Sequence, residues 1–452
     1  MRNRTIVLGV AAIGAVLVAG CATTRTTEEK NAREHLAQTG AVLRPEGVRP
    51  VLPELRADSP LEAFIRFGVL NHPAVEADYH EWRAVVQEIA RARSLPDPQF
   101  TFEADIADAL MTFMPGLMFD LMAPGKRSAM AREMAAQSNV AYRRYVVTVL
   151  RTGTAVRKAW TELAYVEEAV RLRESSLGEL EQALALSEAD YSTGVGMSNL
   201  ETQVRSLNSA GLVRSELAAL RDRRAAARTR LKSALGLSPA DADPAWPAAS
   251  LARSVLLSEE ELWTRARAAN PEIASMQAMV DMAVSSVAVA GKSRTPDFTV
   301  GGMVDLKASP LMFRPTATVT LPIWREKIAA TIGAAEARRD AAVARLDAER
   351  LNVAAELAQM IYMVRESDLM IEYIDATALP NIGRILASVE AGYQSGMGRA
   401  GEIPATRLMA LDMQLERLGA LREREDAISD LSLMIADVSP GLGPVVAEAS
   451  NP

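Results

Sequence analysis

Two stretches of the sequence, ADYSTGVGMSNLETQ at residues 189–203 and AGYQSGMGRAGEIPA at residues 391–405, contain the same turn signal. Tyr191, Gly194 and Gly196 of the first stretch each recur 202 residues further along the chain. Both stretches separate two long segments with a helical pattern, so we expect one helical hairpin tip at 191–198 and another at 393–401. The repeated turn predicts that the chain is an internal duplication.

Three further landmarks recur in the same order. His72-Pro73 and Asn270-Pro271 are 198 residues apart, and so are the strand-like runs that begin at Pro98 and Pro296. Ser59-Pro-Leu-Glu62 and Ser258-Glu-Glu-Glu261 both have the sequence of a capping box, in which a serine and a glutamate satisfy amides at a helix start. We therefore expect a first repeat at 58–237, a proline-containing linker at 238–257 and a second repeat at 258–437.

Each repeat is predicted to contain a helix, two strands, a long helix, a turn and a second long helix. Apolar residues recur every seven positions before the first turn, which indicates a coiled-coil seam against a neighbouring helix; they are Val149, Val156, Leu163, Val170, Leu177 and Leu184. The long helices are expected at about 128–190 and on to about 237, and at about 325–392 and 402–437. The predicted fold class is mainly α with a small β part.

The strands, expected at about 98–124 and 296–322, have polar and apolar residues in alternation. In PTATVTLP, residues 315–322, three threonines alternate with Ala317, Val319 and Leu321. This pattern is typical of a membrane barrel strand with one wet and one lipid-facing side. Four strands cannot enclose an aqueous pore, so we expect the chain to oligomerise. Residues 107–119 do not alternate cleanly, which predicts a barrel that is short, irregular or only partly inserted.

The N-terminus has a basic start, an apolar run from Ile6 to Val18 and small residues before Cys21. This pattern predicts a secretory signal peptide at 1–20. Its end resembles the lipobox of bacterial lipoproteins, which predicts lipid modification of Cys21. The alternative is an ordinary signal peptide that ends near a cysteine. We expect residues 21–57 and the tail 438–452 to be extended. No later apolar run is expected to be long enough for a membrane-spanning helix, so any spanning part is predicted to consist of strands.

Composition and motifs argue against several classes of function. The net charge of -7 disfavours nucleic acid as a partner. The three histidines have no partners at the spacing of metal ligands, and the sequence has no phosphate loop or nucleophile elbow. We therefore predict that the chain is not an enzyme and has no catalytic residue, cofactor or metal site. Methionines crowd the strand regions, where their thioethers could bind Cu(I) or fill space, and we favour the second interpretation; they are Met111, Met114, Met118, Met122, Met303 and Met312.

Taken in order, these features resemble the TolC family of outer-membrane efflux proteins, in its lipoprotein subgroup. The resemblance spans about 58–437. It rests on the helix starts NHPAVEA (71–77) and NPEIASM (270–276), the strand-to-helix junctions LMAPGKR (121–127) and TLPIWREK (320–327), and the two Tyr-x-x-Gly turns. The family fold implies a homotrimer with a twelve-stranded β-barrel, four strands from each subunit, above a long α-helical barrel.

The resemblance also implies roles for residues at the two turns. The tips would dock a periplasmic adaptor, or membrane fusion protein, through a rim of six hairpin tips; the matching residues are Gly194, Val195, Gly196, Met197, Ser198, Gly396, Met397, Gly398 and Arg399. Glycines also serve simply as helix C-caps. Glu402 falls where the family has a gate carboxylate, although a glutamate there also suits a helix N-terminus. A second expected acid is replaced by Ala405.

The function that the resemblance implies is a passive exit duct. The chain would be lipid-anchored in the outer membrane, extend into the periplasm and carry substrates from an inner-membrane transporter of RND or ABC type. Two alternatives remain open at this point. One is a periplasmic coiled-coil scaffold lipoprotein without a pore, and the other is the exit duct of a type I protein secretion system.

Overall fold

The computed structural model describes residues 25–106, 110–193, 200–248, 251, 258–395 and 401–436. The fold is mostly helical, with one four-stranded antiparallel sheet, which confirms the predicted fold class. The chain divides into two compact units. The sheet unit contains the described residues up to Gly47, Ala77–Tyr145 and Glu272–Arg350, and the helical unit contains Val48–Glu76, Val146–Pro271 and the described residues from Leu351 onward.

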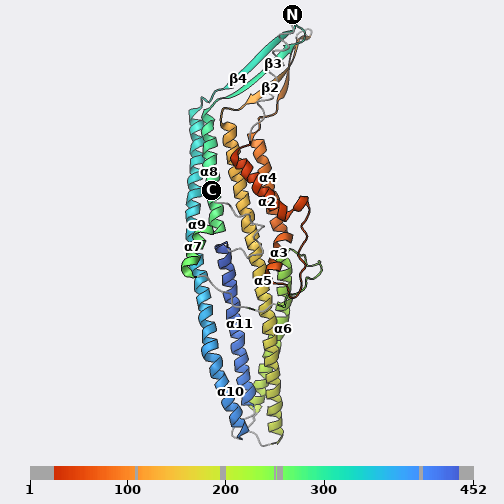
Figure 1. Cartoon of the computed structure of the whole chain (residues 1–452), viewed down its shortest axis with the longest axis vertical. Coiled ribbons are helices and arrows are strands. Elements are labelled where there is room, and N and C mark those ends of the chain that lie inside the picture. Colours follow the sequence, from red (N-terminus) through yellow and green to blue (C-terminus); the bar gives the residue numbers. More distant parts are fainter. Residues whose placement is uncertain are drawn as a thin grey trace. The chain divides into compact units, whose positions relative to one another are not determined.

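The strands lie in the order β1-β2-β3-β4 across the sheet (Figure 1). Its strands are β1 (Gln99–Ile106), β2 (Leu110–Leu121), β3 (Asp297–Asp305) and β4 (Met312–Thr320). The central pairing joins β2 of the first repeat to β3 of the second, from Gly116 opposite Met303 to Leu121 opposite Phe298. Residues 110–121 form a strand despite their imperfect alternation. Within the described residues of the first hairpin, the register shifts between Asp105 and Ile106.

Each strand connects to a helix at one end of the sheet (Figure 1). The helices are α4 (Pro73–Arg93), α5 (Lys126–Thr193), α8 (Pro271–Gly291) and α9 (Arg325–Tyr373). Gly125, with φ of +77°, turns the chain between β2 and α5, a conformation that disfavours residues with a Cβ. Helix α5 has 68 residues, which corresponds to about 100 Å at about 1.5 Å per residue.

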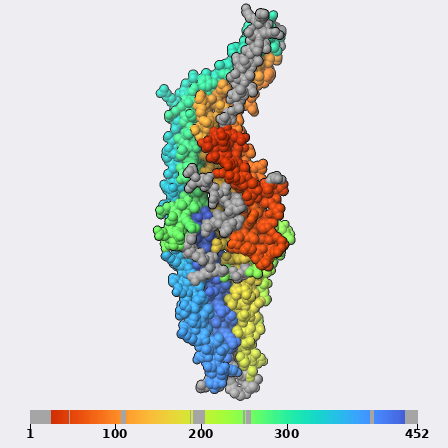
Figure 2. Space-filling view, in the orientation of Figure 1, coloured from red at the N-terminus to blue at the C-terminus, as the bar shows by residue number. Residues whose placement is uncertain are grey.

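Residues 27–43 form helix α2 (Thr27–Leu43), so the prediction that 21–57 is extended is wrong for this segment. The Thr26 hydroxyl accepts a hydrogen bond from the Glu29 amide at 3.2 Å and caps the helix start. The prolines that suggested an extended chain begin only at Pro45, after the helix has ended. Figure 2 shows α2 lying over the start of α5.

An aromatic cluster forms the core between α4 and α5 in the sheet unit. Trp82 stacks on Tyr145 with ring centroids 5.8 Å apart, and Tyr142 lies 4.9 Å from Trp82. Trp82, Tyr145 and Tyr79 are buried, and burial raises the pKa of the Tyr145 phenol far above its usual value. Gly40 of α2 permits close approach of the Tyr79 hydroxyl, because a Cβ at Gly40 would lie 2.7 Å from it.

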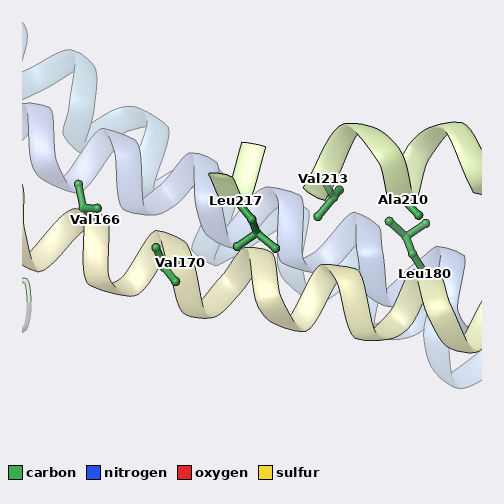
Figure 3. Close-up of a cluster of buried hydrophobic side chains, with 6 residues drawn as sticks. All are labelled: Val166, Val170, Leu180, Ala210, Val213 and Leu217. Atoms are coloured by element: carbon green, nitrogen blue, oxygen red, sulfur yellow. The ribbon is translucent and has the colours of Figure 1, made fainter. Parts of the chain in front are cut away.

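In the helical unit the predicted seven-residue repeat is confirmed as the inner face of α5. Val149, Val156, Leu163 and Val170 are buried. Leu177 and Leu184 pack on the cluster drawn in Figure 3, where α5 meets α6 (Leu200–Ala234). The cluster consists of Val166, Val170, Leu180, Ala210, Val213 and Leu217. A spacing of seven residues places successive apolar side chains near one stripe of the helix. Helix α6 covers the part of this stripe from Val170 to Leu184.

The remaining helices of this unit repeat one arrangement. Helices α3 (Leu61–Asn71) and α7 (Glu259–Ala269) precede α4 and α8 at an offset of 198 residues. Asn71 donates its side-chain amide to the Leu235 carbonyl at 3.0 Å, and Asn270 donates to the Met434 carbonyl at 3.0 Å. Both bonds span 164 residues and fasten a short helix to the end of a long one, so the duplication extends to individual hydrogen bonds.

One of the two predicted capping boxes forms. The Ser258 hydroxyl accepts from the Glu261 amide. The Glu261 carboxylate accepts from the Ser258 hydroxyl at 2.7 Å and from the Ser258 amide at 3.0 Å, and these two hydrogen bonds lower the pKa of Glu261. The prediction for Ser59 is wrong. Helix α3 begins one residue later than expected, with Pro60 as its N-cap, and the Ser59 hydroxyl accepts from the Arg56 amide at 3.0 Å.

The helices before both tips differ from the prediction. Tyr191 lies in the last turn of α5, and Tyr393 lies in α10 (Leu379–Gln394), so neither residue belongs to a turn. The predicted helix 325–392 contains a π-helical turn at Ile374–Ala378 between α9 and α10. Pro380 explains the wider turn, since proline has no N–H to donate and its ring would clash with the carbonyl four residues earlier in a regular α-helix.

One helical segment among the described residues, Glu259–Arg294, is long and apolar enough to cross a membrane by length and composition alone. This contradicts the expectation that no later run reaches that length. The segment contains α8, which buries Val280 and Ala283 against Ala342 and Leu346 of α9. Helix α8 therefore has a packing role within the sheet unit.

Candidate functional site

The sheet has one entirely apolar face. Residues opposite each other in neighbouring strands point to the same side, and side chains alternate along each strand. The register of the strands therefore assigns these residues to one face: Phe100, Phe102, Ala104, Phe113, Pro115, Leu117, Phe119, Leu121, Phe298, Val300, Gly302, Val304, Phe313, Pro315, Ala317 and Val319. The face has no polar side chain.

Much of this apolar face is open to solvent in the single chain. Phe100 is 69% exposed, Phe102 is 68% exposed and Phe313 is 57% exposed. Leu117 and Val319 are also exposed. A continuous apolar surface of this kind is unusual for a soluble monomer and marks a surface for a partner or a membrane.

The opposite face carries all the charged side chains of the four strands, which are Glu103, Asp105, Asp120, Asp297, Asp305 and Arg314. Asp120 accepts hydrogen bonds from both neighbouring strands, from Gln99 at 3.1 Å and from the Thr299 hydroxyl at 2.8 Å. The threonines of β4 lie on this face as well. The polar face is therefore suited to contact with water, and the sheet has the division expected of a barrel wall.

The sheet is fixed to the helices below it by Asp297, the first residue of β3. Its carboxylate accepts from Lys126 Nζ at 2.5 Å and from the Ala123 amide at 3.0 Å. Both donors belong to the junction between β2 and α5. The second repeat is thus attached to the first at the point where the sheet ends and the long helix begins.

Methionine side chains of the polar face lie across glycines of the neighbouring strand. A Cβ built on Gly301 would be 2.5 Å from the Met118 sulfur, and a Cβ on Gly116 would overlap the Met303 side chain. Met114 is 2% exposed. These contacts favour the interpretation of the methionines as space-filling residues. Among the described residues, no group of three His, Cys, Asp or Glu side chains could hold a metal ion.

Most of the site residues predicted from the sequence lie outside the described residues. These are Cys21, Gly194, Val195, Gly196, Met197, Ser198, Gly396, Met397, Gly398 and Arg399. Glu402 is described and exposed, and it is the first residue of α11 (Glu402–Met434). Its carbonyl accepts a hydrogen bond from the Thr406 hydroxyl at 2.8 Å. Its role as a gate residue stays a prediction.

Ion pairs between α5 and α11 in the helical unit were not predicted from the sequence. Lys158 contacts Asp430 at 2.6 Å, and Arg173 contacts Asp412 at 2.6 Å. The guanidinium groups of Arg223 and Arg422 lie over the ring of Tyr165, at 5.0 and 4.8 Å from its centroid. The sequence shows many charges on these helices, but charge spacing within one helix does not tell which charges of another helix will lie opposite.

Comparison with solved structures finds the same fold over most of the chain. The CusC structure, solved in a study of folding and transmembrane channel formation, is 16% identical, covers 84% of this chain and 93% of its own, and has a TM-score of 0.71. The open-state MtrE outer membrane channel of Neisseria gonorrhoeae is 15% identical, with coverage of 86% and 93% and a TM-score of 0.69. The CmeC outer membrane channel of Campylobacter jejuni is 12% identical, with coverage of 84% and 86% and a TM-score of 0.68.

The family model of the outer membrane efflux proteins matches residues 262–436. This part of the chain is therefore similar to the outer membrane efflux proteins. The match falls on the second repeat, and the similar structures extend the shared fold to the first. No curated protein sequence matches the chain. The resemblance that the sequence suggested is confirmed by the family match over the second repeat and by the shared fold over most of the chain. Its lipoprotein subgroup stays a prediction.

Proposed function

We propose that this protein is the outer-membrane channel of a tripartite efflux system. The observation that carries the proposal is the two-faced sheet, whose exposed apolar face suits lipid and whose charged face suits a water-filled lumen. The strands have 8, 12, 9 and 9 residues, close to the roughly 9–11 residues that a tilted strand needs to cross a bilayer.

The functional form is proposed to be a homotrimer. Strands β1 and β4 form the two edges of the sheet and lack a neighbour on one side within the described chain. Unpaired edges seek partners, and four strands are too few to enclose an aqueous pore. Pairing of β1 with β4 of the next subunit, repeated around three copies, gives a closed barrel of twelve strands and removes every edge.

The other parts of the system follow from the family resemblance. Cys21 would carry the lipid anchor in the outer membrane, while the helices extend into the periplasm. The tip residues 194–198 and 396–399 would dock a periplasmic adaptor, and an inner-membrane pump would supply the energy. In this scheme the chain is a passive duct without catalysis or cofactor.

The scaffold alternative is the less favoured one because it leaves the apolar face of the sheet without a purpose. A coiled-coil spacer requires the helical unit but does not require an exposed row of phenylalanines. The type I secretion alternative uses the same channel with a different pump, so it differs in partner and not in the chemistry of this chain.

The function is tested by recording single-channel currents from the purified protein in planar bilayers, with its mass measured by light scattering. We expect a trimer with discrete conductance steps, because three copies close the barrel around the charged face. A monomer that inserts no conducting unit at any protein concentration would contradict the proposal and favour the scaffold.

The gate role of Glu402 is tested in the same recordings. Glu402→Ala is expected to weaken the block of the pore by a multivalent cation, since a ring of three carboxylates would be lost. Glu416→Ala is the control, because Glu416 is an exposed carboxylate on the same helix α11. Equal block in wild type and in Glu402→Ala would remove Glu402 from the gate.

A further inference from the structure

All four helix–strand junctions lie at the same end of the sheet. The β1–β2 and β3–β4 connections lie at the other end. Helices α4, α5, α8 and α9 therefore each begin or end at the same end of the strands (Figure 1). We refer to the two ends as the junction end and the hairpin end. The strands and the helix ends beside them belong to the sheet unit.

The junction end is rich in cations. The four connecting segments 91–98, 122–127, 292–297 and 321–327 contain eight Lys or Arg residues and three Asp or Glu residues, a formal charge of +5 in a chain whose net charge is -7. Each junction contributes two cations. The strand ends at the hairpin end carry Asp105 and Asp305 instead.

Five of these side chains, which we call the junction cations, are Arg127, Lys292, Arg294, Arg325 and Lys327. They form no ion pair within 4.0 Å among the described residues, whereas Lys126 at the same end is paired with Asp297. Arg294, Arg325 and Lys327 are exposed. The Nη1 atom of Arg127 is buried without a hydrogen-bond partner in the described structure. Within the described residues, these five positive charges are therefore left without an acidic partner.

The apolar face of the sheet ends where the cations begin. In the junction from β4 to α9, Leu321, Ile323 and Trp324 are 66%, 65% and 71% exposed, and Arg325 follows directly. Tryptophan is enriched at membrane–water interfaces, because its ring is apolar and its N–H is polar. From the strands of the sheet toward the helices, the surface therefore presents an apolar band, then an exposed tryptophan and then cations.

We propose that the junction cations bind anionic phospholipid headgroups of the leaflet at the junction end of the sheet. The proposal rests on the membrane insertion argued above. A membrane presents an apolar layer and then a layer of phosphates in the same order as this surface presents its apolar band and its cations. Long Lys and Arg side chains place their charges among headgroups while their stems remain on apolar surface, and basic residues beside an anionic leaflet attract its lipids.

The test compares lipid preference in nanodiscs that contain equal amounts of phosphatidylglycerol and phosphatidylcholine. Lipids retained by the released protein are counted by native mass spectrometry. We expect the wild type to retain phosphatidylglycerol in excess over phosphatidylcholine, and we expect high salt to reduce the excess. Arg325→Gln with Lys327→Gln should reduce the excess at least about fivefold, given the contribution of each cation near an anionic surface.

The control variant is Arg338→Gln with Arg345→Gln. It removes the same charge from exposed positions on the same helix α9, away from the junction. We expect it to retain the wild-type preference. Two results would overturn the lipid site and leave the channel proposal intact. In the first, the wild type enters nanodiscs but retains the two lipids equally. In the second, both double variants lose the preference for phosphatidylglycerol to the same extent. Failure of the wild type to enter nanodiscs would overturn both.

Discussion

Ala317→Arg is expected to prevent stable insertion into the outer membrane, whereas Thr318→Arg, one residue further along the same strand, is expected to leave insertion intact. Both positions are exposed in the single chain and lie in the middle of β4. Ala317 belongs to the apolar face and Thr318 to the charged face. The two variants therefore add the same side chain to opposite sides of one strand.

The physical reason is the environment on each side. An arginine that faces lipid near the middle of the bilayer costs roughly 2–4 kcal/mol in β-barrels, and a trimer would incur that cost three times. An arginine in a wet lumen remains hydrated. The expected difference is large compared with the net stability of about 5–15 kcal/mol that is typical of folded domains.

The measurement is the fraction of each variant that remains with outer membranes after extraction with alkaline carbonate. Wild type and Thr318→Arg should remain, and Ala317→Arg should be extracted. Equal extraction of the two variants would show that the apolar face does not contact lipid. A reversed result would assign the charged face to the lipid side.

The second large effect is expected at Gly236, which follows α6 with φ of +73°. A Cβ at this position would lie 2.8 Å from the His72 Cα and 2.9 Å from the Asn71 carbonyl oxygen. Gly236→Ala adds the cost of a left-handed conformation, about 1–2 kcal/mol, to a clash with backbone that cannot rotate away. We expect the free energy of unfolding to fall by at least about 2 kcal/mol.

The second repeat supplies a substitution of the opposite sign. Ala436 follows α11 with φ of +49°, at the place where the first repeat has Gly236. Ala436→Gly should relieve the left-handed conformation and raise stability by up to about 1 kcal/mol, reduced by the greater freedom of glycine in the unfolded chain.

Thermal unfolding in detergent, followed by circular dichroism, measures both variants. Gly211→Ala is the control, because Gly211 lies within α6 with nothing within 4 Å of an added Cβ. It should raise the midpoint slightly, as alanine does in a helix interior. A Gly236→Ala midpoint equal to that of the wild type would show that the end of α6 can adjust away from α3.

The predictions that succeeded depend on local periodicity. The seven-residue spacing from Val149 to Leu184 and the alternation in β4 each fix one face of one element, and the structure has those faces where expected. The duplication was visible because proline, asparagine and glycine recur at helix ends, where the backbone restricts the choice of residue.

The predictions that failed depend on a choice between competing local interactions or on distant partners. Ser59 has the capping sequence, but its hydroxyl accepts a hydrogen bond from the Arg56 amide and does not cap the helix. Helix α2 was not predicted because the whole segment was judged by its prolines, and these begin only after the helix has ended. The ion pairs of α5 with α11 join residues more than two hundred positions apart, as Lys158 and Asp430 illustrate, and no spacing within one helix identifies such a partner.

The pairing of β2 with β3 has a consequence for biogenesis. These strands are separated by the 175 residues 122–296. If the chain is exported as proposed, the central ladder of the sheet cannot form until the second half of the chain has also been exported. Until then the first hairpin has exposed phenylalanines and an unpaired edge in an aqueous compartment, a combination that promotes aggregation. Closing so long a loop is also slow. Under the proposed localisation, we therefore expect the newly exported chain to depend on a periplasmic holding chaperone that shields the first hairpin until its partner strand arrives.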